Sequence, residues 1–598
     1  MTISTLNDLF LQATSTIQKP NLLMHKVGGR YTPLSTQEVR QAVEELACGL
    51  LALGIQRGDP VALLSENRPG WAISDYAILG IGAVNVPIYP TLPPKQIQYI
   101  LEDSQAKAII VSTAAQLEKV RSILDRMPFL QWVISLDEMS MQGNRFRSYS
   151  KVCQSGREKK RQDPDIFARV SAASKEGDLA TLIYTSGTTG NPKGVMLSHR
   201  NLVSNVKSCE GLIELSPMDV ALCLLPLCHI YERMIDYLLL YKGVTIAYAE
   251  SIDAVAANML EVRPTLMASV PRLYEKMYMR LQERATSGSL LERRILEWSV
   301  AAGREWAKER LAGKPVGRWV RAKHGMADRL VFSKFRSRTG GRIRFFLSGG
   351  APLARELGEF FYGARLLILE GYGLTETSPV ITFNRHNHFK FGTVGQPVSG
   401  VEVQIAEDGE ILTRSDSVML GYHHRPQETA EALAEGWFHT GDIGVMDDEG
   451  FLRITDRKKD LIVTSGGKNV APQNIENLLK TCPVVQNAVV VGNRRNFISA
   501  LVVPQFEKIE AYAQATGIPF QSREELVTDP RIVEFVFDRI NKATPELASF
   551  ERIKRIVLLP RDFTIESGEL TPTMKVKRNI VEERYKELID RVYLSRID

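Results

Sequence analysis

The sequence predicts an α/β fold with more than one hydrophobic core, on three observations. Helix-like periodic stretches such as Gln37 to Leu53 alternate with short apolar runs such as Pro60 to Leu64, a pattern typical of helices layered on parallel strands. The 598 residues exceed the roughly 250 to 300 at which single cores stop growing. Five consecutive charged residues, Asp456 to Asp460, separate two strand-like segments and predict a solvent-exposed hinge. We therefore expect a large body of residues 1–455 and a smaller, mobile domain of residues 456–598.

Composition and charge exclude several classes of protein. With 44% hydrophobic and 24% charged residues, the chain is unlike disordered, collagen-like or small disulfide-stapled proteins. Its 75 Lys and Arg against 69 Asp and Glu give a net charge of +6, too mild for a dedicated nucleic-acid binder. The six cysteines are irregularly spaced, without a C-x-x-C pair, which indicates reduced thiols in a cytoplasmic protein.

Neither the N-terminal segment nor the most apolar region of the sequence predicts a membrane protein. The first 20 residues hold no basic segment followed by an apolar run, so no signal peptide is expected. The most apolar long region, Val220 to Ala249, is interrupted by charged residues, so no transmembrane segment is expected. Cys223, Cys228 and His229 within it could be imagined as metal ligands, but no second Cys/His pair stands at zinc-site spacing, and a buried apolar segment is the preferred interpretation.

Two stretches are rich in charge. The first, Gln154 to Asp178, predicts a surface connection rather than core. The second, Leu281 to Phe345, holds 16 Lys and Arg against 6 Asp and Glu and includes Trp298, Trp306 and Trp319. Such a stretch could form a peripheral surface for the anionic headgroups of a membrane's inner face. A solvated helical pair with its aromatic face packed inward is the other interpretation.

The chemically most informative segment is a glycine-rich loop, Tyr184 to Gly194 (YTSGTTGNPKG). It lies between two predicted strands, Leu179 to Ile183 and Val195 to Leu197, and Ser198 is placed to cap the helix that follows. Glycines let backbone N–H groups approach phosphate oxygens, hydroxyls add hydrogen bonds, and Lys193 adds charge. The loop therefore predicts a phosphate cradle. It is not a Walker A loop, because the lysine is not followed by Ser or Thr.

Together with later motifs, this loop resembles those of the adenylate-forming (AMP-binding) superfamily, which contains acyl-CoA synthetases, firefly luciferase and the adenylation domains of peptide synthetases. The resemblance runs from about Arg30 to about Arg578. The later motifs in order are LPLCHIYER, SGGAPL, EGYGLTETSP, GWFHTGDIG, the block from DEGFLRITDRKKD to Glu476, and LTPTMKVKR. The resemblance implies a multi-subdomain α/β body of two sheets plus a small β-barrel, and an α+β C-terminal domain that rotates.

The resemblance also implies roles for individual residues of the body. His229 would border the acyl pocket, Tyr372 would stack on adenine, and Glu376 with the Thr185 hydroxyl would hold Mg²⁺. Asp442 and Arg457 would bind the ribose. The remaining nucleotide contacts would come from Thr185, Ser186, Gly187, Thr188, Thr189, Gly190, Lys193, Gly349, Gly350, Ala351, Pro352, Gly373 and Thr375.

In the C-terminal part, Lys459 resembles the hinge residue and Ser465, Gly466 and Gly467 the loop beside the coenzyme A channel. Lys575 aligns with the mobile catalytic lysine that contacts the acyl carboxylate and the α-phosphate. The sequence departs from the commonest pattern here, because Met574 replaces the usual glycine. Because Lys577 and Arg578 lie within three residues of Lys575, the assignment of the catalytic lysine stays open. Alternatively, these two residues are solvated and open a predicted helix over Asn579 to Val592.

The block through Glu476 resembles fatty acyl-CoA synthetases most, which implies a ligase that uses ATP, Mg²⁺ and coenzyme A to activate a medium- to long-chain fatty acid. An acyl-AMP ligase that loads a carrier protein, an aryl-acid CoA ligase, and a catalytically dead lipid- or nucleotide-binding membrane-associated protein stay open as alternatives. Monomer and homodimer are both compatible with the sequence.

Overall fold

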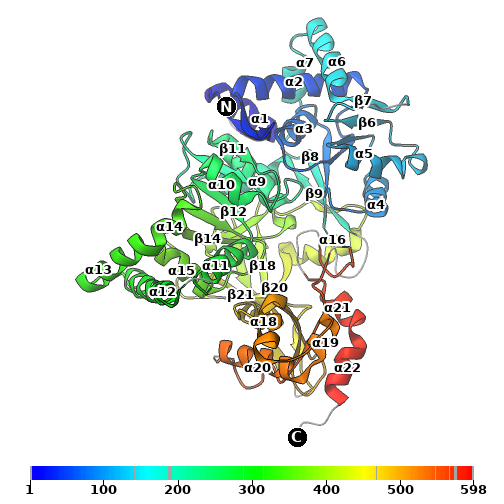
Figure 1. Cartoon of the computed structure of the whole chain (residues 1–598). Coiled ribbons are helices and arrows are strands. Elements are labelled where there is room, and N and C mark those ends of the chain that lie inside the picture. Colours follow the sequence, from blue (N-terminus) through cyan, green and yellow to red (C-terminus); the bar gives the residue numbers. More distant parts are fainter. Residues whose placement is uncertain are drawn as a thin grey trace. The chain divides into compact units, whose positions relative to one another are not determined.

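The computed structural model describes residues 3–139, 143–185, 192–286, 289–313, 315–465, 468–545, 547–564, 566–571 and 576–594. The chain divides into two compact units (Figure 1). Unit 1 comprises Met1–Gln404, Leu412–His439 and Asp448–Leu452, and unit 2 comprises Ile405–Ile411, Thr440–Asp447 and Arg453–Asp598. The boundary placed at Asp456 from the sequence stays a prediction.

The first large sheet of unit 1 has nine strands. In spatial order they are β16 (Gln396–Pro397), β15 (Val380–Phe383), β14 (Leu367–Gly373), β13 (Phe345–Ser348), β12 (Leu266–Ser269), β10 (Val220–Cys223), β11 (Thr245–Tyr248), β1 (Leu23–Val27) and β2 (Arg30–Leu34). The run from β14 to β1 is parallel, and β15, β16 and β2 pair antiparallel to their neighbours.

The second large sheet of unit 1 has eight strands. In spatial order they are β19 (Gly421–Tyr422), β9 (Lys193–Ser198), β8 (Leu179–Thr185), β4 (Val84–Ile88), β3 (Pro60–Leu64), β5 (Ala108–Val111), β6 (Trp132–Ser135) and β7 (Phe146–Ser148). The run from β8 to β7 is parallel, and β9 and β19 are antiparallel additions at one edge. Both sheets confirm the parallel α/β layers expected from the sequence.

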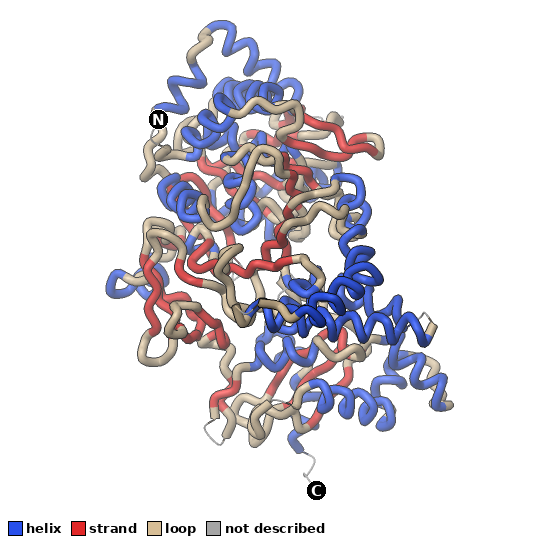
Figure 2. The backbone as a smooth tube through the Cα atoms, turned by 90° about the vertical axis from the view of Figure 1, so that its left-hand side faces the viewer, coloured by secondary structure: helices blue, strands red, loops and turns tan. Residues whose placement is uncertain are grey.

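Helices cover the faces of these sheets (Figure 2). Those of unit 1 are α1 (Leu6–Thr16), α2 (Thr36–Ala52), α3 (Pro69–Gly80), α4 (Pro94–Ser104), α5 (Ala114–Arg121), α6 (Tyr149–Gln162), α7 (Ile166–Ala172), α8 (His199–Cys209), α9 (Ile230–Tyr241), α10 (Val255–Val262), α11 (Pro271–Thr286), α12 (Leu290–Leu311), α13 (Arg318–Ala327), α14 (Ser333–Ser337), α15 (Arg355–Gly363) and α16 (Pro426–Ala432). Short 3₁₀ segments are η1 (Leu124–Arg126), η3 (Thr375–Thr377) and η4 (Ala434–Gly436), and a π-helical segment, η2 (Asp328–Phe332), continues α13.

Helices α3 and α9 form a layer between the two large sheets. α3 packs on β3 and β4 of one sheet and on β1 of the other, and α9 packs on β10 and β11. Both are buried on nearly all sides, as expected for a helix enclosed by a core. Arg233 of α9 and Asp75 of α3 form an ion pair there, with 0% and 1% of their side chains exposed. Tyr237 also donates a hydrogen bond to Asp75, at 2.7 Å.

The charge-rich stretch at Gln154 to Asp178 is largely helical rather than a plain surface connection, because α6 and α7 occupy most of it. Arg157 and Lys160 form ion pairs with Glu45 and Glu44 of α2, and glycines permit close packing of the two helices. A Cβ atom on Gly156 would lie 1.9 Å from the Glu45 carbonyl oxygen, and one on Gly49 would lie 2.3 Å from that of Val152. The sequence did not predict this helix, because its dense charges resemble a loop and the two contacting glycines are 107 residues apart.

The small barrel implied by the sequence is an open, curled, antiparallel half-barrel of four strands, β17 (Glu402–Ile405), β18 (Glu410–Arg414), β20 (Phe438–Met446) and β21 (Leu452–Arg457). Residues of these four strands are divided between the two units. Unit 2 contains the hairpin of β22 (Ile462–Val463) and β23 (Asn469–Val470), and a sheet of β24 (Val485–Val491), β25 (Ser499–Pro504) and β26 (Arg555–Leu558). Its helices are α17 (Pro472–Lys480), α18 (Phe506–Thr516), α19 (Arg523–Thr528), α20 (Pro530–Ala543), α21 (Arg578–Arg584) and α22 (Lys586–Leu594). Strands and helices of unit 2 share one apolar core.

Two local expectations in unit 2 are wrong. Asp456 is 3% exposed, because the alternation of β21 places it on the same face as buried Leu452; burial raises the pKa of its carboxyl to about 7. The helix expected over Asn579 to Val592 is instead α21 and α22, interrupted at Tyr585.

The tryptophans of the basic stretch at Leu281 to Phe345 are partly packed inward and partly exposed, so each interpretation holds for some of them. Trp306 faces inward and stacks on His324 at 4.5 Å between ring centroids, whereas Trp319 is 83% exposed and Trp298 is 37% exposed. No helix within the described residues is both long and apolar enough to cross a membrane.

Candidate active site

The residues predicted to bind nucleotide in unit 1 follow the carboxyl ends of neighbouring parallel strands. Gly349 to Pro352 come directly after β13, Tyr372 and Gly373 end β14, and His229 lies between β10 and α9. β13 pairs with both β12 and β14, so these loops leave the sheet at one edge. In open α/β sheets ligands bind outside the carboxyl ends of the strands.

The loop Gly349 to Pro352 depends on its glycines. The Gly349 N–H donates to the Ser269 carbonyl at 3.3 Å, and a Cβ atom on Gly349 would lie 3.0 Å from the Tyr231 ring. Gly350 has φ +78°, a conformation that favours glycine. The loop ends where the Leu353 N–H donates to the buried Glu370 carboxyl at 3.2 Å. Burial raises the pKa of Glu370 to about 8.

Tyr372, Gly373, Thr375 and Glu376 follow as one turn. Tyr372 is 8% exposed. A Cβ atom on Gly373 would lie 1.7 Å from the Pro379 carbonyl oxygen, so only glycine fits this close approach. Thr375 and Glu376 then form the η3 turn. The sequence motif therefore encodes the turn that places the Glu376 carboxylate.

The predicted phosphate loop is described at its two ends. Thr185 ends β8, Lys193 begins β9, and the two residues are register partners. β8 and β9 are two and three residues longer than predicted. The Ser198 hydroxyl caps α8 as expected, accepting from the Asn201 N–H at 3.2 Å. Ser186, Gly187, Thr188, Thr189 and Gly190 lie outside the described residues.

Tyr422 connects Lys193 to Glu376. β19 pairs with β9, which places the Tyr422 ring 5.0 Å from the Lys193 Nζ. The Tyr422 hydroxyl donates to Glu376 Oε1 at 2.9 Å. Burial, and then Glu376, raise the pKa of Tyr422, so this hydroxyl keeps its proton to donate. Lys193 also forms an ion pair with Glu428 of α16.

His229 has a structural role as well as a place at the sheet edge. Its Nδ1 accepts the Tyr231 N–H at 3.2 Å and so caps α9. In the neutral ring an accepting Nδ1 leaves the proton on Nε2. The segment before it is held by Asn67, whose side chain donates to the Leu225 carbonyl at 2.6 Å and accepts from the Leu227 N–H at 2.9 Å.

In unit 2, the structure brings together the two residues predicted to bind ribose. Asp442 of β20 is 4% exposed, and its Oδ1 lies 3.1 Å from Arg457 Nε. Lys459 lies in the exposed turn after β21. The Ser465 N–H donates to the Arg495 carbonyl at 2.9 Å. Gly466, Gly467 and Lys575 lie outside the described residues.

Sequence reasoning missed Tyr422, Glu428 and Asn67. Tyr422 and Glu428 follow Lys193 by more than 200 residues and meet it only because β19 joins the edge of the eight-stranded sheet. A Tyr between Gly421 and His423 has no spacing that indicates a site. The pairing of distant strands, rather than a motif, is what recruits it.

Family models match nearly the whole chain. The model described as AMP-binding enzyme matches residues 10–423, and the model described as AMP-binding enzyme C-terminal domain matches residues 459–596. Among curated proteins, the chain is 38% identical over 570 residues to the long-chain-fatty-acid–CoA ligase FadD15 of Mycobacterium tuberculosis, covering 95% of this chain and 93% of that protein. It is 33% identical over 626 residues to the peroxisomal long chain acyl-CoA synthetase 6 of Arabidopsis thaliana, covering 99% and 86%.

Solved structures share the fold. The anthranilate CoA ligase AuaEII in complex with anthranoyl-AMP superposes with a TM-score of 0.74 at 20% identity, over 98% of each chain. The adenylation domain of a carboxylate reductase from Mycobacterium chelonae gives 0.75 at 24% identity, over 99% of this chain and 91% of that one. The chain therefore belongs to the AMP-binding, adenylate-forming enzymes and is an AMP-forming acid–thiol ligase of the acyl-CoA ligase class.

Proposed function

We propose that this ligase activates a medium- to long-chain fatty acid. The acid attacks the α-phosphate of ATP, pyrophosphate leaves, and the acyl-adenylate then passes its acyl group to the thiol of coenzyme A as AMP leaves. The observation that supports the substrate class is the 38% identity to a long-chain-fatty-acid–CoA ligase along 95% of the chain. No side-chain nucleophile is needed, because the substrates supply both nucleophiles.

The first step brings two anions together, so the site has to neutralise charge as it develops. We assign Lys193 to the departing pyrophosphate, Lys575 to the carboxylate and α-phosphate, and His229 to the border of the acyl pocket. Tyr372, Gly373, Thr375 and the loop Gly349 to Pro352 hold the base and α-phosphate region. Asp442 and Arg457 hold the ribose, and the loop Thr185 to Gly190 holds the phosphates.

The Glu376 carboxylate and the Thr185 hydroxyl are oxygen donors of the kind that Mg²⁺ prefers. Glu376 is already oriented by the Tyr422 hydroxyl, which fits a residue that holds a metal. When bound, Mg²⁺ would offset negative charge on the phosphates. Tyr422 and η3 set the direction of the Glu376 carboxylate in this structure.

Residues 456–598 form, in this proposal, a domain that rotates about Lys459 between the two steps. A lysine beside the α-phosphate assists adenylation but obstructs the approach of a thiol, so its withdrawal serves the second step. Ser465, Gly466 and Gly467 would line the path of coenzyme A.

The test is an AMP-release assay with ATP and saturated acids of increasing chain length, with and without coenzyme A. We expect turnover to depend on coenzyme A and to rise from acetate to acids of 12 to 18 carbons. A flat profile would reject the fatty-acid assignment, and a preference for benzoate would favour an aryl-acid ligase. A single turnover unaffected by coenzyme A would favour an acyl-AMP ligase that loads a carrier protein.

The Lys193–Glu428 ion pair should compete with ATP. Since both side chains are about one-third exposed, such a pair contributes about 0–1 kcal/mol, and Glu428→Gln should lower the KM for ATP up to about fivefold. The kcat should change little. Steady-state kinetics with Glu431→Gln, on the same helix α16, provide the matched control; an unchanged or raised KM in Glu428→Gln would contradict the competition.

We further propose that the basic stretch Leu281 to Phe345 contacts anionic membrane surfaces through helix α13 and the π-helical segment η2. Trp319, Met326 and Leu330 are exposed by 83%, 58% and 40% and recur at helical spacing beside Lys323 and Arg329. Exposed aromatic and aliphatic side chains among basic ones are typical of helices that lie on a membrane surface.

Sedimentation with vesicles tests that contact. We expect more binding to vesicles containing phosphatidylglycerol than to pure phosphatidylcholine, and weaker binding at high salt. Trp319→Ala should lower binding about tenfold, because burying a large apolar side chain contributes ~1.5–3 kcal/mol. Met218→Ala, which removes an 83% exposed side chain elsewhere in unit 1, should not. Equal binding to both vesicle types would refute the contact.

A further inference from the structure

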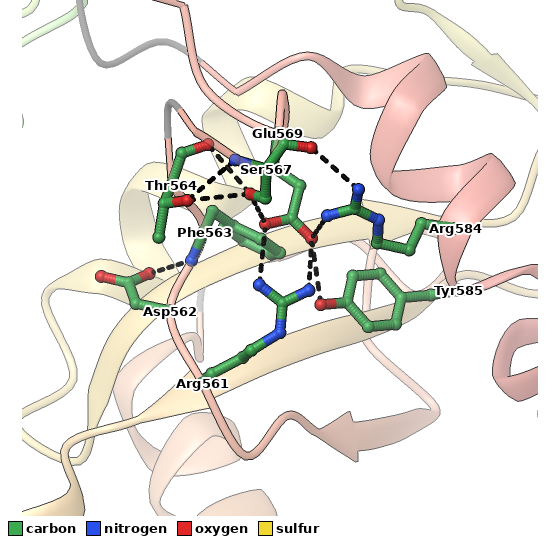
Figure 3. A network of polar contacts seen from close by, with 8 residues as sticks. All are labelled: Arg561, Asp562, Phe563, Thr564, Ser567, Glu569, Arg584 and Tyr585. Carbon is green, nitrogen blue, oxygen red and sulfur yellow. Dashed lines mark hydrogen bonds and ion pairs between the residues drawn. The ribbon is translucent and has the colours of Figure 1, made fainter.

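Glu569 of unit 2 is a fully buried carboxylate surrounded by donors (Figure 3). Its contacts are with Arg561 Nη1 and Nη2 at 3.4 and 3.3 Å, Arg584 Nη1 at 2.9 Å, the Tyr585 hydroxyl at 3.1 Å and the Ser567 hydroxyl at 2.5 Å. Both carboxylate oxygens are therefore satisfied. The sequence motifs assign no role to any residue of this network.

The donors come from both sides of one short segment, residues 571–576. Arg561 and Ser567 precede it, and Arg584 and Tyr585 follow it at the end of α21. On a continuous helix, adjacent side chains point about 100° apart. The interruption at Tyr585 lets both Arg584 and Tyr585 reach the same carboxylate.

The backbone ties the two ends of the same segment together. The Lys577 N–H donates to the Glu569 carbonyl at 2.8 Å, and the Leu570 N–H donates to the Thr564 carbonyl at 3.0 Å. Leu570 and Val576 form an antiparallel bridge. Glu569, at the entrance of the segment, thus binds the chain after its exit twice, by its carbonyl to the Lys577 N–H and by its carboxylate to Arg584 and Tyr585.

The network is charged as well as geometrically closed. Burial raises the pKa of Glu569, but the hydrogen bonds from Ser567, Arg584 and Tyr585 and the charge of Arg561 outweigh burial and lower it, so the carboxylate is ionised at neutral pH. Leu570, 2% exposed, already anchors the segment by apolar packing, which is non-directional. Charge-assisted hydrogen bonds add a fixed direction.

We propose that Glu569 is a positioning residue for adenylation: its network fixes the two ends of the segment that carries Lys575. This inference rests on the proposed role of Lys575 in the first half-reaction. The Glu569 side chain is enclosed by protein donors, so we assign it no contact with substrate. Losing its charge should misplace the lysine without removing it, and small misplacements of a catalytic group far from the mutation can cost about 100-fold in rate.

The experiment measures the two half-reactions separately in the full chain. Acid-dependent pyrophosphate release reports adenylation, and thioester formation from supplied acyl-adenylate and coenzyme A reports the second step. Glu569→Gln should lower the kcat of adenylation about 10- to 100-fold, leave the KM for ATP and acid unchanged, and leave thioester formation within about twofold. Glu569→Asp, which keeps the charge, should recover part of the lost rate.

Glu510→Gln is the matched control, because Glu510 pairs with Arg523 in the same unit away from this segment; its adenylation rate should be normal. If Glu569→Gln does not fold, Tyr585→Phe, which removes one donor, should still lower adenylation selectively. Normal adenylation in the folded variants, or equal loss of both half-reactions, overturns the inference. If Lys575→Ala itself spares adenylation, the proposed role of Lys575 fails and this inference with it, whereas the ligase function is tested by the chain-length assay; an impaired Lys575→Ala beside a normal Glu569→Gln overturns the inference alone.

Discussion

Lys575→Ala is expected to lower acid-dependent pyrophosphate release about 100- to 1,000-fold while sparing thioester formation from supplied acyl-adenylate. The magnitude is that of removing one group that stabilises charge in the transition state. The selectivity follows because only the first half-reaction brings a carboxylate against a phosphate. Separate assays of the two steps, with purified acyl-adenylate for the second, measure it.

Lys577→Ala is the control for that experiment, since the sequence left Lys577 and Arg578 as neighbours of the predicted catalytic lysine. In the structure Arg578 has a different role, because its guanidinium binds Glu476 at 2.6 Å and the Val490 carbonyl. Lys577 contributes its backbone N–H to Glu569, which an alanine retains. A loss of adenylation in Lys577→Ala with normal Lys575→Ala would transfer the role to Lys577.

Arg233→Met is expected to destabilise unit 1 by about 3–5 kcal/mol, because it leaves Asp75 charged and buried without its partner. The Asp75 carboxylate would keep the hydrogen bonds from Tyr237 at 2.7 Å and Asn85 at 2.5 Å, which offset only part of that cost. The measurement is the denaturant midpoint of the unfolding transition of unit 1, followed by tryptophan fluorescence.

The double variant Arg233→Met with Asp75→Leu should recover much of the lost stability, because replacing a buried ion pair by apolar groups is often neutral. Glu297→Ala, which breaks the exposed Arg293–Glu297 pair of α12, should have no measurable effect. A small effect of Arg233→Met, equal to that of Glu297→Ala, would contradict the role given to the buried pair.

Local pattern predicted the strands of unit 1 well. The runs Pro60 to Leu64 and Ala108 to Val111 are β3 and β5 to the residue, because continuous apolar runs buried in a parallel sheet are distinctive. The cap at Ser198 was also predictable, since an N-cap interaction is complete within four residues.

What could not be predicted depends on contacts between distant residues. Asp456 lies on the buried face of β21, which could not be predicted because it belongs to a run of five charged residues. Tyr422 reaches Lys193 and Glu376 only through the pairing of β19 with β9. Glu569 directly precedes the motif LTPTMKVKR, and its role is visible only in the structure, where Arg561 and Arg584 both contact its carboxylate.

The order of strands in the nine-stranded sheet has a consequence for synthesis on the ribosome. β1 pairs with β11, with Leu23 opposite Ile246. The ribosome therefore synthesises about 220 further residues before the partner strand of β1 exists. At about 5–20 residues per second that interval lasts about 10 to 45 s. Throughout it the β1–β2 hairpin presents an unpaired edge, the kind of surface that chaperones shield and that pairs wrongly with other nascent chains. Slowing translation between β2 and β11 should therefore lower the yield of folded enzyme more than slowing it after β16.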